Sequence, residues 1–137
     1  MSYLIFPALF AVLFACNAME TKPEIVLGRE WNSAAQVVAD TASQFKPNDV
    51  IIIHIDNGKP FPAPEVELKI YQDGSNRVLF KRTSHVKDNG SKLTIKGLTS
   101  RPLTVKDILL TSTPGIYRVT FAVGDSVLAE KKMELVK

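Results

Sequence analysis

The single cysteine of this sequence stands where covalent chemistry on its thiol is expected. Cys16 ends an apolar run over 3–15, and acidic residues and lysines begin only after it. A disulfide requires a second thiol, and the sequence contains one cysteine. The thiol of Cys16 is therefore free for another covalent modification.

The residues before Cys16 resemble the lipobox of bacterial lipoproteins. In that motif a leucine and a small residue precede a cysteine, which is lipidated and becomes the mature N-terminus. Leu13-Phe14-Ala15-Cys16 follows this pattern except for the bulky Phe14. The apolar run has the length of a secretory signal core and is too short to span a bilayer. The resemblance implies a signal peptide over 1–15, a lipidated tether over 16–23 and attachment to a membrane through lipid on Cys16.

Two features of the leader leave alternatives open. No Lys or Arg precedes Lys22, and Pro7 interrupts the apolar run, so Met1 need not be the true start. If the leader is only cleaved, Cys16 is inert and the protein is secreted and soluble; if it is retained, the run is a buried helix. Asn17 follows the cysteine. An Asp at this position would resemble an inner-membrane retention signal, and the sequence has no Asp there. In a lipoprotein this favours the outer membrane, with the domain periplasmic or surface-exposed.

Few other residues have spacings that suit catalysis. His54 and Asp56 would share one face of a strand, as a catalytic dyad requires. The same two residues equally suit a non-catalytic hydrogen bond on the protein surface. Glu65 and Glu67 have a separation that glycosidases use, but the adjacent Lys69 favours a solvated face. Neither histidine has a partner at metal-binding spacing. We therefore assign no catalytic, metal-binding or cofactor-binding residue and expect no enzyme.

The composition limits the class of partner. A chain of 137 residues leaves room for one domain after the leader. The formal net charge is +3, with Lys and Arg interleaved with Asp and Glu. Aromatic residues do not alternate with cations as on a nucleic-acid stacking surface. We expect a mildly basic, solvated surface and no nucleic-acid partner.

From residue 24 onward, short runs that alternate apolar and polar residues are separated by turn residues, which predicts strands. The stretch 33–45 is ambiguous, since Ser33 and Gln36 mimic a helix capping box, but we prefer a strand at 36–40. An element between 103 and 110 has no clear boundaries. The expected strands cover residues 24–30, 36–40, 50–55, 65–71, 77–82, 92–96, 116–123 and 127–135.

The run 50–55 is β-branched and should be the central buried strand. Ile53 and Phe121 should enter the same core from two different strands. Lys131 shares the register of apolar neighbours, so it should lie where its strand bulges or leaves the core. Trp31 is expected to pack in the core, and the alternative role for it is an exposed binding aromatic.

The C-terminal region resembles an immunoglobulin-like sandwich. Tyr117 follows Pro114-Gly115, which resembles the tyrosine corner at the start of strand F in such folds. The antibody-type cysteines are absent, which indicates a generic bacterial Ig-like module. We expect an all-β fold, an immunoglobulin-like antiparallel β-sandwich of about 7–8 strands over 24–137.

The loop 56–64 is the expected partner-binding element. Three prolines between 60 and 64 fix its backbone, and a stiff loop loses little entropy on binding. The loop 83–91 and the turn Gly124-Asp125 should flank it. Chagasin-type protease inhibitors have a similar size and architecture, although their loop motifs are not found here. The predicted contact residues are Asp56, Asn57, Lys59 and Phe61.

These patterns lead to a main functional expectation and an alternative. The main one is a lipid-anchored cell-envelope protein whose non-catalytic Ig-like domain has a structural or interaction role, with a protein as its partner. The alternative is a protease inhibitor or ligand-binding module that uses the loop 56–64.

Overall fold

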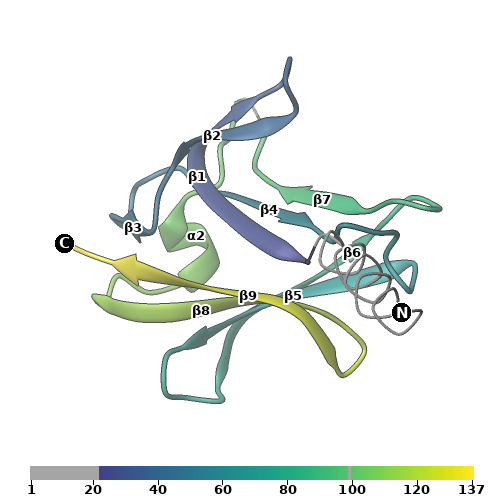
Figure 1. Cartoon of the computed structure of the whole chain (residues 1–137). Coiled ribbons are helices and arrows are strands. Elements are labelled where there is room, and N and C mark those ends of the chain that lie inside the picture. Colours follow the sequence, from purple (N-terminus) through teal and green to yellow (C-terminus); the bar gives the residue numbers. More distant parts are fainter. Residues whose placement is uncertain (1–21, 99) are drawn as a thin grey trace, which may run out of the picture.

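The computed structural model describes residues 22–98 and 100–137, so the leader over 1–15 and the lipidation candidate Cys16 lie outside the described residues. Nine strands and one short helix follow one another along the described chain (Figure 1). Their bounds are β1 Glu24–Asn32, β2 Val37–Thr41, β3 Gln44–Phe45, β4 Ile52–Asp56, β5 Glu65–Gln72, β6 Val78–His85, β7 Lys92–Ile95, α2 Val105–Leu109, β8 Gly115–Val123 and β9 Ser126–Leu135.

The strands form two sheets that face each other as a sandwich (Figure 1). One sheet has the order β2-β1-β4-β7 and the other the order β3-β9-β8-β5-β6. All neighbouring strands are antiparallel except β3 and β9. In this order β4, β5, β8 and β9 correspond to strands B, C, F and G of the immunoglobulin fold. The expected Ig-like β-sandwich is confirmed.

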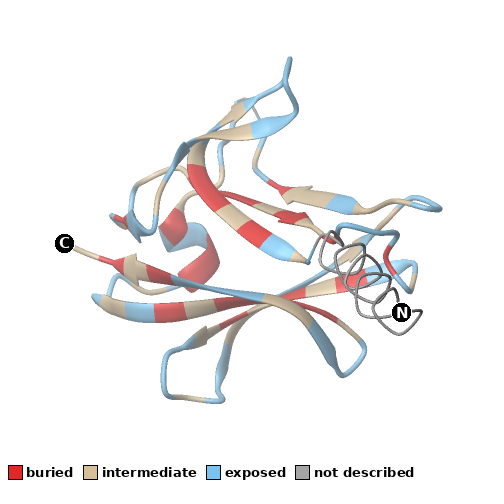
Figure 2. Ribbon diagram, in the orientation of Figure 1, coloured by how far each residue is buried: buried red, intermediate tan, exposed pale blue. Residues whose placement is uncertain are grey.

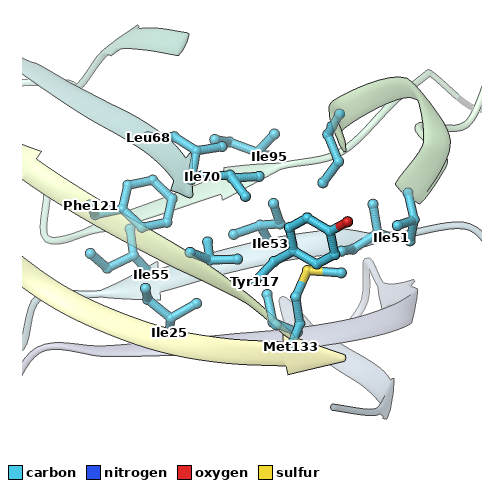
Figure 3. Close-up of a cluster of buried hydrophobic side chains, with 14 of the residues drawn as sticks. Ile25, Ile51, Ile53, Ile55, Leu68, Ile70, Ile95, Tyr117, Phe121 and Met133 are labelled. Carbon is cyan, nitrogen blue, oxygen red and sulfur yellow. The ribbon is translucent and has the colours of Figure 1, made fainter. Parts of the chain in front are cut away.

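The core lies between the sheets and is built from the inward faces of most strands together with α2, whereas β2 and β6 contribute no buried residue (Figure 2). Successive side chains of a strand point to opposite faces, so alternate residues of β5 are buried. Ile53 and Phe121 are both fully buried in this core, as the sequence predicts (Figure 3). Ile51 and Ile55 are fully buried as well, and β4 lies between β1 and β7. The prediction of a central, buried strand is therefore confirmed.

The stretch 33–45 contains strand β2 and a turn, as preferred, and no helix. The side chain of Asn32 accepts a 3.0 Å hydrogen bond from the backbone N–H of Ala35. The side-chain amide of Gln36 donates a 2.7 Å hydrogen bond to the carbonyl of Ser33. Gln36 also has a φ of 55°, in the left-handed region, which a continuing helix does not allow. Ser33 and Gln36 therefore close the β1–β2 hairpin instead of capping a helix.

The segment after β7 forms α2, a helix that the strand prediction missed. The hydroxyl of Thr104 accepts a 3.3 Å hydrogen bond from the N–H of Asp107, whose carboxylate accepts a 3.0 Å bond from the N–H of Thr104. This reciprocal pair is a capping box that starts a helix. The helix buries Val105, Ile108 and Leu109, whose spacing of three and four is that of one helical face.

Lys131 is exposed, although Met133 and Leu135 of the same strand are buried. The pairing of β8 with β9 changes register between Phe121 and Ala122, which leaves Leu128 as an extra residue in β9. This bulge does not turn Lys131 outward, because residues 129–135 keep a single register against β8. In the described structure β3 pairs with β9 only at Glu134 and Leu135, so Lys131 lies on an open stretch of the sheet edge, where its ammonium reaches solvent. The expected exposure of Lys131 is confirmed.

Candidate functional site

The loop between β4 and β5 is braced by its own polar groups. The carboxylate of Asp56 accepts a 2.9 Å hydrogen bond from the N–H of Gly58. The side-chain amide of Asn57 donates to the carbonyls of Lys59 at 3.0 Å and Pro60 at 3.4 Å. Gly58 has a φ of 74°, which glycine adopts at no steric cost. These contacts add to the three prolines in holding the loop in one conformation.

The loop is also joined to the segment that connects β6 to β7. The N–H of Asn57 donates to the carbonyl of Ser91 at 2.8 Å, and that of Phe61 donates to the carbonyl of Gly90 at 2.9 Å. A third bond of 2.9 Å runs from the N–H of Val86 to the carbonyl of Pro64. The flanking role expected for 83–91 is therefore confirmed.

The turn Gly124-Asp125 belongs to the same end of the sandwich. Residue Ala122 of β8 pairs with Glu67 near the start of β5, so the turn that follows β8 comes beside the end of the loop 57–64. We call residues 57–64, 86–91 and 124–125 the loop end.

The structure corrects half of the predicted contact residues of this loop. Lys59 is exposed and Asp56 is half-buried. Asn57 is only 1 % exposed, because its amide must lie inside the loop to reach two carbonyls. Phe61 is 9 % exposed and packs into the core, where burial of a large aromatic ring is favourable. The residues available to a partner at the tip are Gly58, Lys59 and Pro60.

The charges of the loop end are mixed. Lys59 and Lys87 are exposed there together with Asp88 and Asp125. Opposite charges at close spacing do not build a field of one sign that would attract a highly charged ligand. Recognition at the loop end would therefore depend on the shape of the braced loop.

A second cluster lies on the outer face of the four-stranded sheet and includes Trp31, which the sequence analysis placed in the core. Its ring is centred 5.6 Å from that of His54, and the Nζ of Lys96 lies 4.9 Å from the Trp31 ring centre. Strand β1 pairs with β4 only from Glu24 to Gly28, so Trp31 lies beyond the last β1–β4 pair. The prediction of a core tryptophan was wrong for this reason.

His54 is half-buried beneath Trp31. One ring nitrogen lies 2.7 Å from the hydroxyl of Thr94 on the neighbouring strand. Burial lowers the pKa of His54 below its usual value of 6.5, since the charged ring loses water. The carboxylate of Asp56 acts against this effect and the charge of Lys92 adds to it. The ring is therefore held neutral and packs between Trp31 and Thr94.

Among residues 22–98 and 100–137, no group of three or more His, Cys, Asp and Glu side chains is placed to hold a metal ion. In the same part of the chain, no helix has the length and apolar character needed to cross a membrane.

Comparison with solved structures finds a protein of the same fold. The chain is similar to an immunoglobulin-like protein from Pseudomonas aeruginosa, with a TM-score of 0.51 and 12% sequence identity. The match covers 86% of this chain and 99% of the other. No protein-family model matches the sequence. No curated protein matches it with significance. At this identity the similarity shows the Ig-like fold alone.

Proposed function

We propose that this protein is a lipid-anchored, non-catalytic interaction module of a bacterial cell envelope. The observation that carries the proposal is the lipobox-like sequence Leu13-Phe14-Ala15-Cys16, which lies eight residues before the first described strand. Strand β1 starts at Glu24, which pairs with Asp56 next to the loop end. The proposed tether over 16–23 would span at most about 28 Å when fully extended. Lipid on Cys16 would therefore keep the domain close to a membrane.

This attachment would also orient the domain. The tether reaches the sandwich at the loop end, so that end would lie toward the lipid. Helix α2 and the start of β8 lie at the opposite end, because Thr104 next to α2 bridges to Val50 before β4. Large partners would then bind the sides of the sandwich or the end that includes α2.

Metabolic labelling tests the lipid anchor directly. Cells that express the full chain are fed a labelled fatty acid, and we expect the label on the wild-type protein and on Ser33→Ala, an exposed control. Cys16→Ala should lose the label and move from the membrane to the soluble fraction. An unlabelled wild-type protein would remove the lipid anchor from the proposal.

Site-specific fluorophores test the orientation. The sequence has no cysteine besides Cys16, so a second one introduced into the acylated protein would be the only free thiol. Lys59→Cys labels the loop end and Lys106→Cys labels α2, and both positions are exposed. A quencher in the bilayer should dim the label at position 59 more than the label at position 106. Equal quenching would contradict the orientation.

The braced loop supports a second candidate function, the loop-mediated inhibition of a protease. Lys59 and Pro60 are exposed at the tip of a loop whose conformation is already held by Asn57. Such preorganisation lowers the entropic cost of binding. The full chain would be tested against a papain-class cysteine protease, with Lys59→Ala as the variant and Lys106→Ala as the control. Loss of inhibition in the first alone supports this candidate, and absence of inhibition by the wild type excludes it for that protease class.

A further inference from the structure

The outer edge of strand β6 has free backbone groups. In the described structure β6 pairs with β5 on one side, and no strand pairs with its other side. Alternate N–H and C=O groups of such an edge point away from the sheet and can pair with an extended chain. The edge runs over eight residues, which is long enough to hold a peptide strand.

The same edge is basic. The segment 77–87 contains Arg77, Lys81, Arg82 and Lys87 and has no acidic residue. Lys81 forms an ion pair of 3.3 Å with Glu67, whereas no acidic partner of Arg77, Arg82 or Lys87 occurs among the ion pairs of the described residues. Arg82 pairs with the buried Leu68 and so lies on the core-facing side of the edge strand. An added strand would meet the charge of Arg82 on the core-facing side and Lys81, already paired with Glu67, on the other side.

A cavity of about 370 Å³ lies at the start of β6. Its walls include the apolar residues Val78 and Leu79 of this edge and Leu109 and Leu110 at the end of α2. Polar residues complete the lining, namely Gln72, Arg77, Thr111 and Thr113, together with Tyr117. Val78 is 41% exposed and Leu110 is 76% exposed. Leu110 has a φ of 54°, at a helix end where glycine or asparagine is favoured, yet it presents a large apolar side chain to solvent. An apolar side chain bound in this cavity would cover both residues.

From the edge, its charge and the cavity we propose that β6 binds an extended acidic segment of a partner protein as a sixth strand of the sheet. The segment would run antiparallel to β6, with carboxylates near Lys81 and Arg82 and a large apolar side chain near its C-terminal end in the cavity at Leu110. Backbone pairing supplies affinity, and the cavity and charges supply selectivity. The inference rests on the proposed function, because it assigns a surface to the interaction module.

A second copy of this chain is disfavoured at the edge in the register centred on its cations. Two β6 strands paired antiparallel around Lys81 and Arg82 would place these cations opposite each other, and like charges directly across a strand pair are destabilising. Charged edge strands commonly prevent sheets from joining in this way. The acidic partner strand removes this repulsion.

A synthetic peptide tests the site. The probe has about nine residues, with glutamate alternating with threonine and a leucine near its C-terminus, and a fluorescent label at its N-terminus. Binding to the full chain in detergent is followed by fluorescence anisotropy. We expect Arg82→Glu to weaken binding by about tenfold or more and Leu110→Ser to weaken it by about fivefold. Lys59→Glu makes the same charge change at the loop end and should leave binding unchanged.

Three outcomes would overturn the inference. The first is no binding to the wild type up to about 1 mM peptide. The second is equal binding to Arg82→Glu, or equal binding of a peptide with lysine in place of glutamate. The third is a dimer of the free protein, measured by sedimentation, that dissociates in Arg82→Glu. A second copy of the chain would then occupy the edge. Labelling of Cys16 is measured separately, so a failed lipid anchor and a failed peptide site are distinguishable.

Discussion

The phenolic hydroxyl of Tyr117 donates a 2.7 Å hydrogen bond to the backbone carbonyl of Thr113, four residues earlier in the chain. The ring of Tyr117 is buried at the start of β8, which corresponds to strand F. A tyrosine at this position that bonds back to the preceding backbone is a tyrosine corner. The resemblance seen in Pro114-Gly115 before Tyr117 is therefore matched by the geometry. The bond ties the connection from α2 to the first residues of β8.

Tyr117→Phe should lower the free energy of unfolding by about 1 kcal/mol, because it removes this hydrogen bond and keeps the buried ring. Urea denaturation followed by circular dichroism measures the change. Tyr71→Phe is the control, since Tyr71 is half-buried on the outer face of the same sheet and its hydroxyl forms no side-chain hydrogen bond found in the described structure. A larger loss in Tyr71→Phe than in Tyr117→Phe would contradict the tyrosine corner.

Ile53→Ala and Phe121→Ala should each lower the free energy of unfolding by about 2–5 kcal/mol, through lost burial and the cavity that remains. Both side chains have no exposed surface and lie in the core between the sheets. Val127→Ala, at a position that is 62% exposed, is the matched control and should change stability little. Thermal unfolding of the three variants measures the change. If the melting temperature of Phe121→Ala equals that of the parent, β8 and β9 are peripheral to the core.

Gly28→Ala should destabilise the β1–β2 hairpin. A Cβ at this position would clash with the side chain of Val38 and approach the carbonyl oxygen of Ala39 to 2.7 Å. Overpacking of this kind costs about 1–3 kcal/mol. The double variant Gly28→Ala with Val38→Ala should recover only part of the loss, because the backbone carbonyl remains in place. Full recovery in urea denaturation would show that the side chain alone causes the clash.

His54 should make stability depend on pH. Its folded-state pKa is lowered by burial, so the neutral ring favours folding above the unfolded value of 6.5. This contribution is lost as the pH falls from 6.5 through the lowered pKa, because the unfolded chain binds the proton first. As the pH is lowered from above 6.5 through the lowered pKa of His54, the unfolding free energy of the wild type minus that of His54→Gln should therefore decrease.

Trp31 provides an independent readout of the same titration. It is the sole tryptophan of the chain, and its ring is centred 5.6 Å from that of His54. The fluorescence of the folded protein should change with a midpoint below 6.5, the usual pKa of histidine. The change should be absent in His54→Gln and retained in His85→Gln. A transition that persists in His54→Gln would assign it to another group.

Only part of the candidate site was predictable. The prolines and Asp56-Asn57-Gly58 indicate a stiff loop, and that loop is present. Which of its side chains face solvent was not predictable, because burial of Phe61 requires space in the core and the backbone of the loop is held at Asn57 by a carbonyl of the distant residue Ser91. The basic edge of β6 was missed as well, although the charges of 77–87 are visible in the sequence.

The sequence by itself determined the elements that depend on neighbouring residues. Alternation of apolar and polar residues predicted the strands, the β-branched run at 50–55 predicted the buried strand, and Pro114-Gly115 before Tyr117 predicted the corner. The capping box of Thr104 and Asp107 is equally local, so α2 was readable even though it was not recognised. These features are set by backbone preferences and side-chain spacing over a few residues.

Tertiary structure alone decided the features that depend on which strands meet. Trp31 has the register of a core residue but lies outside, because β1 extends past the last pair it makes with β4. The edge of β6 is free because the strand order places β6 at the end of its sheet. The cavity exists because the start of β6 and the end of α2 both line it. Contacts between residues far apart in the chain decide burial and exposure at these positions, and no local pattern encodes them.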